Sequence, residues 1–412
     1  MKVEFLGGAR EVGRSAVLVN DRLLLDYGME ASNPPQFPVG RVDPDAVVVS
    51  HGHLDHAGTV PSLLSGEDRP PVHWTPPTER LTRVLASDTL KLHGGTYDCP
   101  FTEAEVKRLT EVSHTHGYRE PFEAAGHTVT FYDAGHIPGS AHVLVDDGET
   151  RLLYSSDFHT TAQRIVPAST ARPEADAVIV ESTYADVDRE DRATIEERFV
   201  DLVERTLWEG GTVVVPAFAI GRTQEMLLVC AAHDLDPYVD GMGKRVARIL
   251  REYPGYVRDH DALRGAISNA RFVTGRDGQR RRIAAESSVI VTTSGMLSGG
   301  PAMTYVPAVA GDPTNTIALT GYQVEGTPGR DLVETGSAEI DGRRIRVSAR
   351  VEQFDFSAHA DRPGLRSFLS SYRDARVLVN HGDRTERFAT DLRADGYDAS
   401  APAVGDVVEL DG

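Results

Sequence analysis

The chain has 412 residues, 40% of them hydrophobic, which is long enough for two domains or for one domain with a large insertion. Its formal net charge of −19 argues against general affinity for nucleic acid. It contains no 18-residue apolar run and no cationic, apolar leader at the start, so a soluble cytoplasmic protein without a membrane partner is expected.

The basic residues are almost all arginine. Lysine occurs only at positions 2, 91, 107 and 244, among 43 basic residues in all. An acidic surface that is poor in lysine keeps a protein dispersed when salt screens charge repulsion, so we interpret the composition as halophilic and disfavour a merely acidic mesophilic protein. The two cysteines, Cys99 and Cys230, are too few for a disulfide framework and are expected to be buried small side chains.

Short strands separated by turn residues are predicted over the N-terminal third. The segments 2–8 and 15–28 are apolar or alternating, and 45–50 (DAVVVS) is continuously apolar, as in a strand covered on both faces. Four later segments share one pattern, a strand that ends in a turn with Asp, Glu or His: 127–136, 150–159, 175–186 and 375–383. Layered α/β folds place their sites at such strand ends.

The pattern changes from about residue 188. Segment 188–211 has helical periodicity and stops at paired glycines, and 212–219 followed by 221–235 is typical of a strand, a turn and a helix. Segment 287–295 is another buried strand. This alternation predicts a parallel-sheet subdomain inserted into the first domain, and the strand-then-His pattern returns after about residue 350.

The stretch VVVSHGHLDHAGTV, residues 47–60, places His51, His53, Asp55 and His56 within six residues. Imidazole and carboxylate are good ligands for zinc and similar metals. His51 and His53 can face one ion, while Asp55 and His56 turn toward a second position. A helix-capping loop with incidental histidines is disfavoured, because so many unpaired polar groups would be costly in a core.

Three further ligand-type residues each end a predicted strand: His136, Asp157 and His381. Alone, each is more often an ordinary turn residue. Together with the first four they suit two metals that share a carboxylate, an arrangement that can clamp a scissile phosphodiester.

These residues resemble the motifs of a known family. HGHLDH is similar to the HxHxDH motif of the metallo-β-lactamase fold, and Asp26 in LLLDYG resembles the motif that precedes it. His136 and Asp157 resemble the next two motifs. The segments AIGRTQE and TTSGMLSGG resemble recurrent segments of the β-CASP branch, whose three further motifs are similar to those around Glu181 (IVESTYAD), His359 (FSAHAD) and His381 (LVNHGD).

The resemblance covers nearly the whole chain. It implies an α/β fold, a metallo-β-lactamase αββα sandwich with an inserted β-CASP parallel α/β subdomain. The expected domains are residues 1–182 (metallo-β-lactamase, first part), 183–352 (β-CASP) and 353–412 (metallo-β-lactamase, C-terminal part). The motifs resemble those of archaeal homologues of the cleavage and polyadenylation factor endonuclease subunit, which, with the composition, suggests a halophilic archaeon.

The resemblance also implies roles for individual residues. Asp26 would orient a metal ligand, Glu181 would pair with His359, and these three form the expected catalytic set. His142 is rejected as a ligand, because the family places the ligand in the AGH position. Two Zn²⁺ per chain are expected, one held by His51, His53 and His136, the other by Asp55, His56 and His381, with Asp157 bridging.

The expected function is a zinc-dependent ribonuclease that cuts single-stranded RNA internally. The alternatives are a 5′-to-3′ exoribonuclease, a small-molecule hydrolase acting on thioesters or lactones, and an inactive scaffold. A homodimer is left open. The phosphate-loop interpretation of GMGKR is disfavoured, because that segment lacks an earlier glycine and a following Ser or Thr. The expected RNA contacts are Arg222, Ser294, Arg280, Arg281 and Arg282, with structural ion pairs as the alternative for these arginines.

Overall fold

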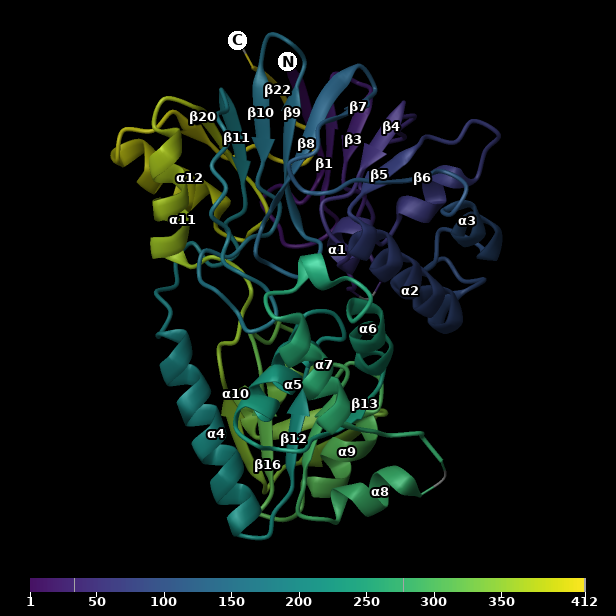
Figure 1. Cartoon of the computed structure of the whole chain (residues 1–412), viewed down its shortest axis with the longest axis vertical. Coiled ribbons are helices and arrows are strands. Elements are labelled where there is room, and N and C mark those ends of the chain that lie inside the picture. The colour runs from purple at the N-terminus through teal and green to yellow at the C-terminus, as the bar shows by residue number, and fades with distance from the viewer. Residues whose placement is uncertain (33, 277, 411–412) are drawn as a thin grey trace. The chain divides into compact units, whose positions relative to one another are not determined.

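A computed structural model describes residues 1–32, 34–276 and 278–410, and it divides into two compact units (Figure 1). Unit 1 comprises Met1–Ala162, Pro167–Asp188 and Ala358–Gly412, and unit 2 comprises Gln163–Val166 and Arg189–Ser357. The boundaries between the two units therefore lie about five residues after the expected domain boundaries.

Local contacts explain the position of these boundaries. Tyr184 forms a β-bridge with Asp361, and Arg362 pairs with Asp188, so residues 183–188 are held to unit 1. Phe354 and Phe356 pack edge-on against Phe199 in the core of unit 2, which holds residues 353–357 there.

Unit 1 is built on two seven-stranded sheets. The first has the order β22-β1-β2-β3-β4-β5-β6, with β1 (Lys2–Gly7), β2 (Ala16–Val19), β3 (Leu23–Leu25), β4 (Ala46–Val48), β5 (Val72–Trp74), β6 (Ser113–Thr115) and β22 (Val407–Glu409). The second has the order β21-β20-β11-β10-β9-β8-β7, with β7 (Phe122–Ala124), β8 (His127–Asp133), β9 (Ala141–Asp146), β10 (Arg151–Tyr154), β11 (Ala177–Val180), β20 (Arg376–Val379) and β21 (Ala399–Ser400).

The two sheets face each other across one apolar core, to which Phe5 and Val17 contribute from the first sheet and Phe131 and Val143 from the second. Helices cover both outer faces (Figure 1). The first sheet is covered by α1 (Leu54–Ala57), η1 (Val60–Leu64), α2 (Pro76–His93) and α3 (Glu103–Arg108), and the second by α11 (Arg362–Leu369), η3 (Ser370–Tyr372) and α12 (Thr385–Ala394). The αββα sandwich expected from the sequence is confirmed.

Unit 2 contains a six-stranded sheet in which every pair is parallel, with the order β14-β13-β15-β12-β16-β19. Its strands are β12 (Val213–Pro216), β13 (Tyr238–Asp240), β14 (Arg271–Phe272), β15 (Val289–Thr292), β16 (Thr316–Leu319) and β19 (Arg350–Gln353), and a separate hairpin pairs β17 (Ser337–Ile340) with β18 (Arg343–Arg346). The helices are α4 (Arg192–Trp208), α5 (Arg222–Ala232), α6 (Gly243–Leu250), η2 (Pro254–Tyr256), α7 (His260–Asn269), α8 (Gln279–Ala284), α9 (Ala302–Val309) and α10 (Pro328–Thr335).

The sheet of unit 2 is buried on both faces, which explains its continuously apolar strands. Val213 and Val215 face one core, which they share with α4 and α5, whereas Val214 faces a second core that includes Tyr305 of α9. The predicted helix after residue 188 is α4, which Asp191 caps by accepting a hydrogen bond from the Ala193 amide. The inserted parallel α/β subdomain is therefore present as predicted.

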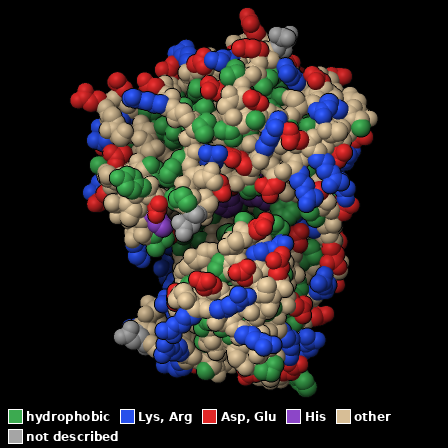
Figure 2. Space-filling view, turned by 180° about the vertical axis from the view of Figure 1, so that it is seen from behind, with side chains coloured by type: hydrophobic (Ala, Val, Ile, Leu, Met, Phe, Trp, Pro, Cys, Tyr) green, Lys and Arg blue, Asp and Glu red, His purple; other side chains and the backbone are tan. Residues whose placement is uncertain are grey.

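The surface carries charges of both signs. Acidic and basic side chains are interspersed on the face shown in Figure 2. Both cysteines, Cys99 and Cys230, are buried, as expected. In the part of the chain that the structure describes, no helix combines the length and the apolar character needed to cross a membrane.

Candidate active site

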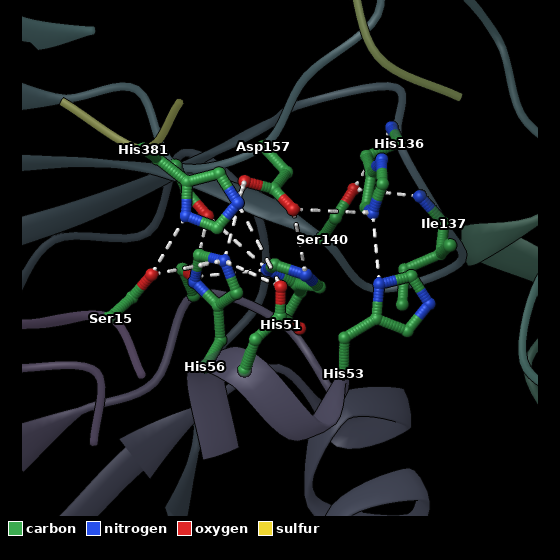
Figure 3. Close-up of polar contacts among 12 residues, drawn as sticks. Ser15, His51, His53, His56, His136, Ile137, Ser140, Asp157 and His381 are labelled. Atoms are coloured by element: carbon green, nitrogen blue, oxygen red, sulfur yellow. Dashed lines mark hydrogen bonds and ion pairs between the residues drawn. The ribbon is translucent and has the colours of Figure 1, made fainter. Parts of the chain in front are cut away.

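The seven ligand-type residues of the sequence motifs all lie in unit 1, and the folded chain brings them together. Figure 3 labels all of them except Asp55. They follow the ends of β4, β8, β10 and β20 and the start of α1. They form two groups that could each hold a metal ion, and Asp157 belongs to both. The first group is His51, His53, His136 and Asp157, and the second is Asp55, His56, Asp157 and His381.

In the first group, three imidazoles surround one oxygen of Asp157. His51 Nε2 lies 3.5 Å from Asp157 Oδ2, and His136 Nε2 lies 3.7 Å from the same oxygen. His53 Nδ1 is 3.0 Å from His136 Nε2. These nitrogen and oxygen atoms therefore converge on one position.

In the second group, the other oxygen of Asp157 is the shared atom. His56 Nε2 and His381 Nε2 lie 3.3 and 3.6 Å from Asp157 Oδ1. Asp55 Oδ2 is 3.8 Å from His381 Nε2 and 4.0 Å from His56 Nε2. Asp157 thus directs one carboxylate oxygen to each group, as a bridging ligand would.

The donor atoms fit a bound cation. His51 Nε2, His381 Nε2 and Asp157 Oδ1 are buried and have no hydrogen-bond partner among the described residues, although buried polar atoms are nearly always satisfied. A mixed imidazole and carboxylate set suits zinc and similar divalent metals. Burial and the neighbouring His56 hold the pKa of His51 well below its usual range, so its ring is in the neutral form that binds metals.

Outer hydrogen bonds fix how the imidazoles point. Asp26 Oδ2 lies 2.7 Å from His56 Nδ1, and His136 Nδ1 lies 2.9 Å from the Ala358 carbonyl oxygen. Since each Nδ1 faces an acceptor, it carries the proton and leaves Nε2 as the ligand atom. Ser15 Oγ contacts His381 Nδ1 at 2.9 Å in the same way.

Besides His56, three further donor groups hold Asp26. Its Oδ1 accepts a hydrogen bond from the Ser50 amide at 2.7 Å, and its Oδ2 accepts bonds from the Ser50 and Tyr154 hydroxyls at 2.7 and 2.9 Å. Ser156 adds a hydroxyl 3.2 Å from His51 Nδ1. Sequence reasoning missed Ser15, Ser50, Ser156 and Tyr154. Of these, only Ser50 and Ser156 could have been suspected from the sequence, because each directly precedes a predicted metal ligand.

Strained backbone accompanies this site. Asp26, Ser156 and His381 have φ values of 58°, 50° and 44°, in the left-handed region that side-chain-bearing residues rarely adopt. Such residues cost about 1–3 kcal/mol each and cluster where function requires a particular geometry. The backbone also packs closely at Gly28, where a Cβ would lie 1.8 Å from the Asp55 carbonyl oxygen, so this position requires glycine.

Glu181 and His359 form a third group with Asp157. His359 Nδ1 lies 2.9 and 3.1 Å from the two Glu181 oxygens, and its Nε2 lies 3.9 Å from Asp157 Oδ2. Burial acts to lower the pKa of His359, but Glu181 and Asp157 outweigh it and raise this pKa to about 9. His359 therefore carries a proton at neutral pH and presents its Nε2 side to the metal ligands.

His142 lies outside these groups, in agreement with its rejection as a ligand. Its Nδ1 is 2.7 Å from the Ser155 carbonyl oxygen and its Nε2 is 2.7 Å from Ser169 Oγ. The ring packs against Phe158 and Phe368, and burial lowers its pKa to about 4.

The expected RNA contacts all lie in unit 2. Arg222 begins α5, and Ser294 follows β15 and accepts a hydrogen bond from the Ser298 amide. Arg280 pairs with buried Asp240 at 2.7 Å, which agrees with the structural alternative for that residue. Arg282 is 4.0 Å from Glu286, and Arg281 is exposed with no carboxylate partner among the described residues.

Family comparisons agree with this geometry over most of the chain. The metallo-β-lactamase superfamily matches residues 9–196, the Beta-Casp domain matches residues 223–332, and the Zn-dependent metallo-hydrolase RNA specificity domain matches residues 344–402. A crystal structure of a protein of unknown function from Enterococcus faecalis V583 has the same fold, with a TM-score of 0.63 at 12% identity over 99% of both chains.

Curated relatives align over nearly the full length. RNase aCSPSF2 of Saccharolobus solfataricus is 34% identical over 425 positions, which cover 99% of this chain and 85% of that protein. Probable RNase MJ4 of Methanocaldococcus jannaschii is 30% identical and covers 100% of both. Transcription termination factor FttA of Pyrococcus abyssi is 31% identical over 100% of this chain and 71% of its own length. The chain therefore belongs to the β-CASP family of metallo-hydrolases within the metallo-β-lactamase superfamily.

Proposed function

We propose that the chain is a zinc-dependent ribonuclease that hydrolyses phosphodiester bonds within single-stranded RNA. The observation that carries the proposal is the pair of metal-ligand groups that share Asp157, with protonated His359 beside them. The relatives named as ribonucleases support RNA as the substrate. A cytoplasmic location and a halophilic source belong to the same proposal.

The ligands divide between two zinc ions. His51, His53 and His136 would hold one, and Asp55, His56 and His381 would hold the other, with Asp157 contributing to both. When bound, two such ions supply Lewis acidity that neutralises charge on the scissile phosphate and lowers the pKa of an attacking water.

The protein side chains supply orientation and the proton. Glu181 accepts from His359 Nδ1 and is itself fixed by the Phe158 amide, which donates to its Oε1 at 3.0 Å. With Nδ1 occupied, the Nε2 proton of His359 is the one available to the departing 3′ oxygen. Asp26 fixes His56 and acts as a positioning residue. General-acid help of this kind contributes about 10²–10⁴ in rate.

The alternatives predict different products. A 5′-to-3′ exoribonuclease would use the same groups but would release mononucleotides from one end. A thioesterase or lactonase would act on small molecules and leave RNA intact. An inactive scaffold is disfavoured, because each of the seven ligand positions holds a ligand-type residue within its group.

The test is cleavage of 5′-labelled and 3′-labelled single-stranded RNA by zinc-loaded protein, at low and at molar salt. Internal fragments from both labels support the proposal, and mononucleotides released from the 5′ label favour the exonuclease. Turnover of a thioester or a lactone without RNA cleavage would replace the proposal with the small-molecule hydrolase. Arg222, Ser294 and Arg281 are the RNA contacts we propose, and their alanine variants should raise KM. Sedimentation of the same sample tests the homodimer.

A further inference from the structure

Unit 2 carries a small hairpin that is separate from its parallel sheet. Strand β17 pairs with β18 in antiparallel register, so that Ala338 lies opposite Ile345 and Ser337 opposite Arg346. Asp341 and Gly342 form the turn with φ values of 51° and 69°, the two positive angles that a tight two-residue hairpin turn requires. The hairpin is therefore held by local geometry.

One face of the hairpin is apolar. Ala338 and Ile340 are buried in a core cluster of unit 2 that also contains Leu332 of α10, and half-buried Ile345 packs against the same cluster. Alternation along a strand directs the neighbours of Ile345 to the other face. Arg344 and Arg346 consequently share the outer face, roughly 7 Å apart along β18.

The basic residues of β18 stand out in an acidic chain. Arg343, Arg344 and Arg346 are exposed, and no carboxylate among the described residues forms an ion pair with any of them. Glu339 lies opposite Arg344 in register without pairing to it. In contrast, Arg350, a few residues on, is paired with Glu209.

Guanidinium groups without carboxylate partners suit a phosphate backbone. A guanidinium that is already paired must exchange one anion for another when it binds phosphate, whereas Arg344 and Arg346 have no such pair to break. Guanidinium also binds phosphate through two parallel hydrogen bonds, which an ammonium cannot do. Because a net charge of −19 repels RNA over the whole chain, binding has to rely on local patches such as this one.

We propose that the outer face of β18 binds the phosphate backbone of single-stranded RNA, through Arg344 and Arg346 with Arg343 beside them. This inference rests on the proposed ribonuclease function and adds a contact surface that the motif residues do not include. Contacts to phosphate carry no sequence preference, so the hairpin should increase affinity for RNA of any sequence.

The test measures RNA binding as a function of salt, with the double variant R344Q/R346Q. A fluorescent single-stranded RNA is used with zinc-loaded protein that also carries His359→Ala, which keeps the RNA intact. Each phosphate contact to a single strand contributes about 0.7 to the slope of log K against log salt, so loss of two contacts lowers the slope by about 1.4. Extrapolated from 1 M salt, this corresponds to a loss of affinity of about 25-fold at 0.1 M.

Two controls separate a specific contact from a change of net charge or of folding. R264Q/R271Q removes two exposed arginines elsewhere in unit 2 and should keep the slope. R344K/R346K keeps the charge and should retain most of the slope. An unchanged slope in R344Q/R346Q, or an equal loss in R264Q/R271Q, would overturn the inference while leaving the ribonuclease intact. If the parent protein neither binds nor cuts RNA, the proposed function fails and the inference fails with it.

Discussion

Asp26→Asn isolates the role of the carboxylate behind the metal ligands. Asp26 is fully buried and receives four hydrogen bonds, three of them at Oδ2, from the Ser50 hydroxyl, the Tyr154 hydroxyl and His56 Nδ1. The fourth comes from the Ser50 amide to Oδ1 at 2.7 Å. Asparagine has nearly the same shape, but it replaces one acceptor oxygen with an NH₂ donor. Whichever way the amide turns, this donor faces another donor.

The expected cost follows from these contacts. Removing one partner of a buried ion pair costs about 3–5 kcal/mol, and altering an outer partner of a metal-ligating histidine lowers metal affinity about 10–100-fold. Tyr154→Phe is the matched control. It removes a single donor to the same oxygen, and loss of one hydrogen bond to a charged group costs about 1.5–3 kcal/mol. Burial and the charge of Asp26 raise the pKa of Tyr154 well above its usual range, so its hydroxyl remains a donor throughout the assay.

The chain provides its own reporter for this measurement. Of its two tryptophans, Trp74 is fully buried in unit 1 and Trp208 is 87% exposed at the end of α4 in unit 2. In a Trp208→Phe background, denaturant unfolding followed by tryptophan fluorescence reports unit 1 alone. Zinc affinity is measured separately, by competition with a chromophoric chelator. If Asp26→Asn unfolds within about 0.5 kcal/mol of the parent, within the range of ordinary surface changes, and binds zinc equally well, the assigned role is wrong.

Three further predictions test other parts of the chain. His381→Ala should lose zinc, whereas His359→Ala should keep zinc and cleave RNA about 10²–10⁴ times more slowly. Metal analysis and single-turnover cleavage measure the two effects. Zinc loss or normal cleavage in His359→Ala would contradict the role assigned to His359. The pKa of His142 is lowered by burial to about 4, below the unfolded value of about 6.5, so the unfolded chain takes up the proton first as the pH falls. The free energy of unfolding of unit 1 should therefore fall by up to about 3 kcal/mol between pH 6.5 and 4. If the His142→Gln variant loses the same amount over this pH range, His142 is not the cause. Arg281→Glu should weaken RNA binding without altering zinc content. Arg280→Glu should instead destabilise unit 2, because it places a second carboxylate beside that of Asp240. Unchanged RNA affinity in Arg281→Glu would show that Arg281 does not contact the RNA.

The sequence predicted the ligands because of where they stand in the chain. His136, Asp157 and His381 each come two or three residues after the end of a strand, and strand ends of this kind gather at one edge of a sheet. The inserted parallel α/β subdomain was predictable from the alternation of apolar strands and helical segments after residue 188, whereas the αββα sandwich was expected from the resemblance of the motifs. The four ligand-type residues within the six-residue run from His51 to His56 needed no tertiary information at all.

The supporting contacts could not be predicted, because they join residues that are far apart in sequence. Tyr154 reaches Asp26 from a position 128 residues away, and Ser15 reaches His381 from 366 residues away. A buried tyrosine at a strand end and a serine in a turn look ordinary in sequence. The same limit applies to Arg280 of helix α8, whose partner Asp240 lies 40 residues away at the end of strand β13. Choosing between an ion pair and an RNA contact at that arginine required the fold.

The geometry of the site is imposed by the protein scaffold. Left-handed backbone at Asp26 and His381 is stabilised by strand and loop hydrogen bonds, from the Asp26 amide to the Val48 carbonyl and from the His381 amide to the Gly8 carbonyl. Hydrogen bonds at Nδ1 orient His56 and His136 independently of any ion. Because these contacts are formed when unit 1 folds, the folding free energy offsets the strain of the left-handed backbone before a cation binds. A bound cation then needs only to contact the buried ligand atoms that lack hydrogen-bond partners, at Asp157 and its neighbours. His359 is held by Glu181 outside the two four-residue groups, so proton delivery and metal binding depend on separate side chains. These side chains meet where His359 lies beside Asp157 and packs edge-on against the ring of His136.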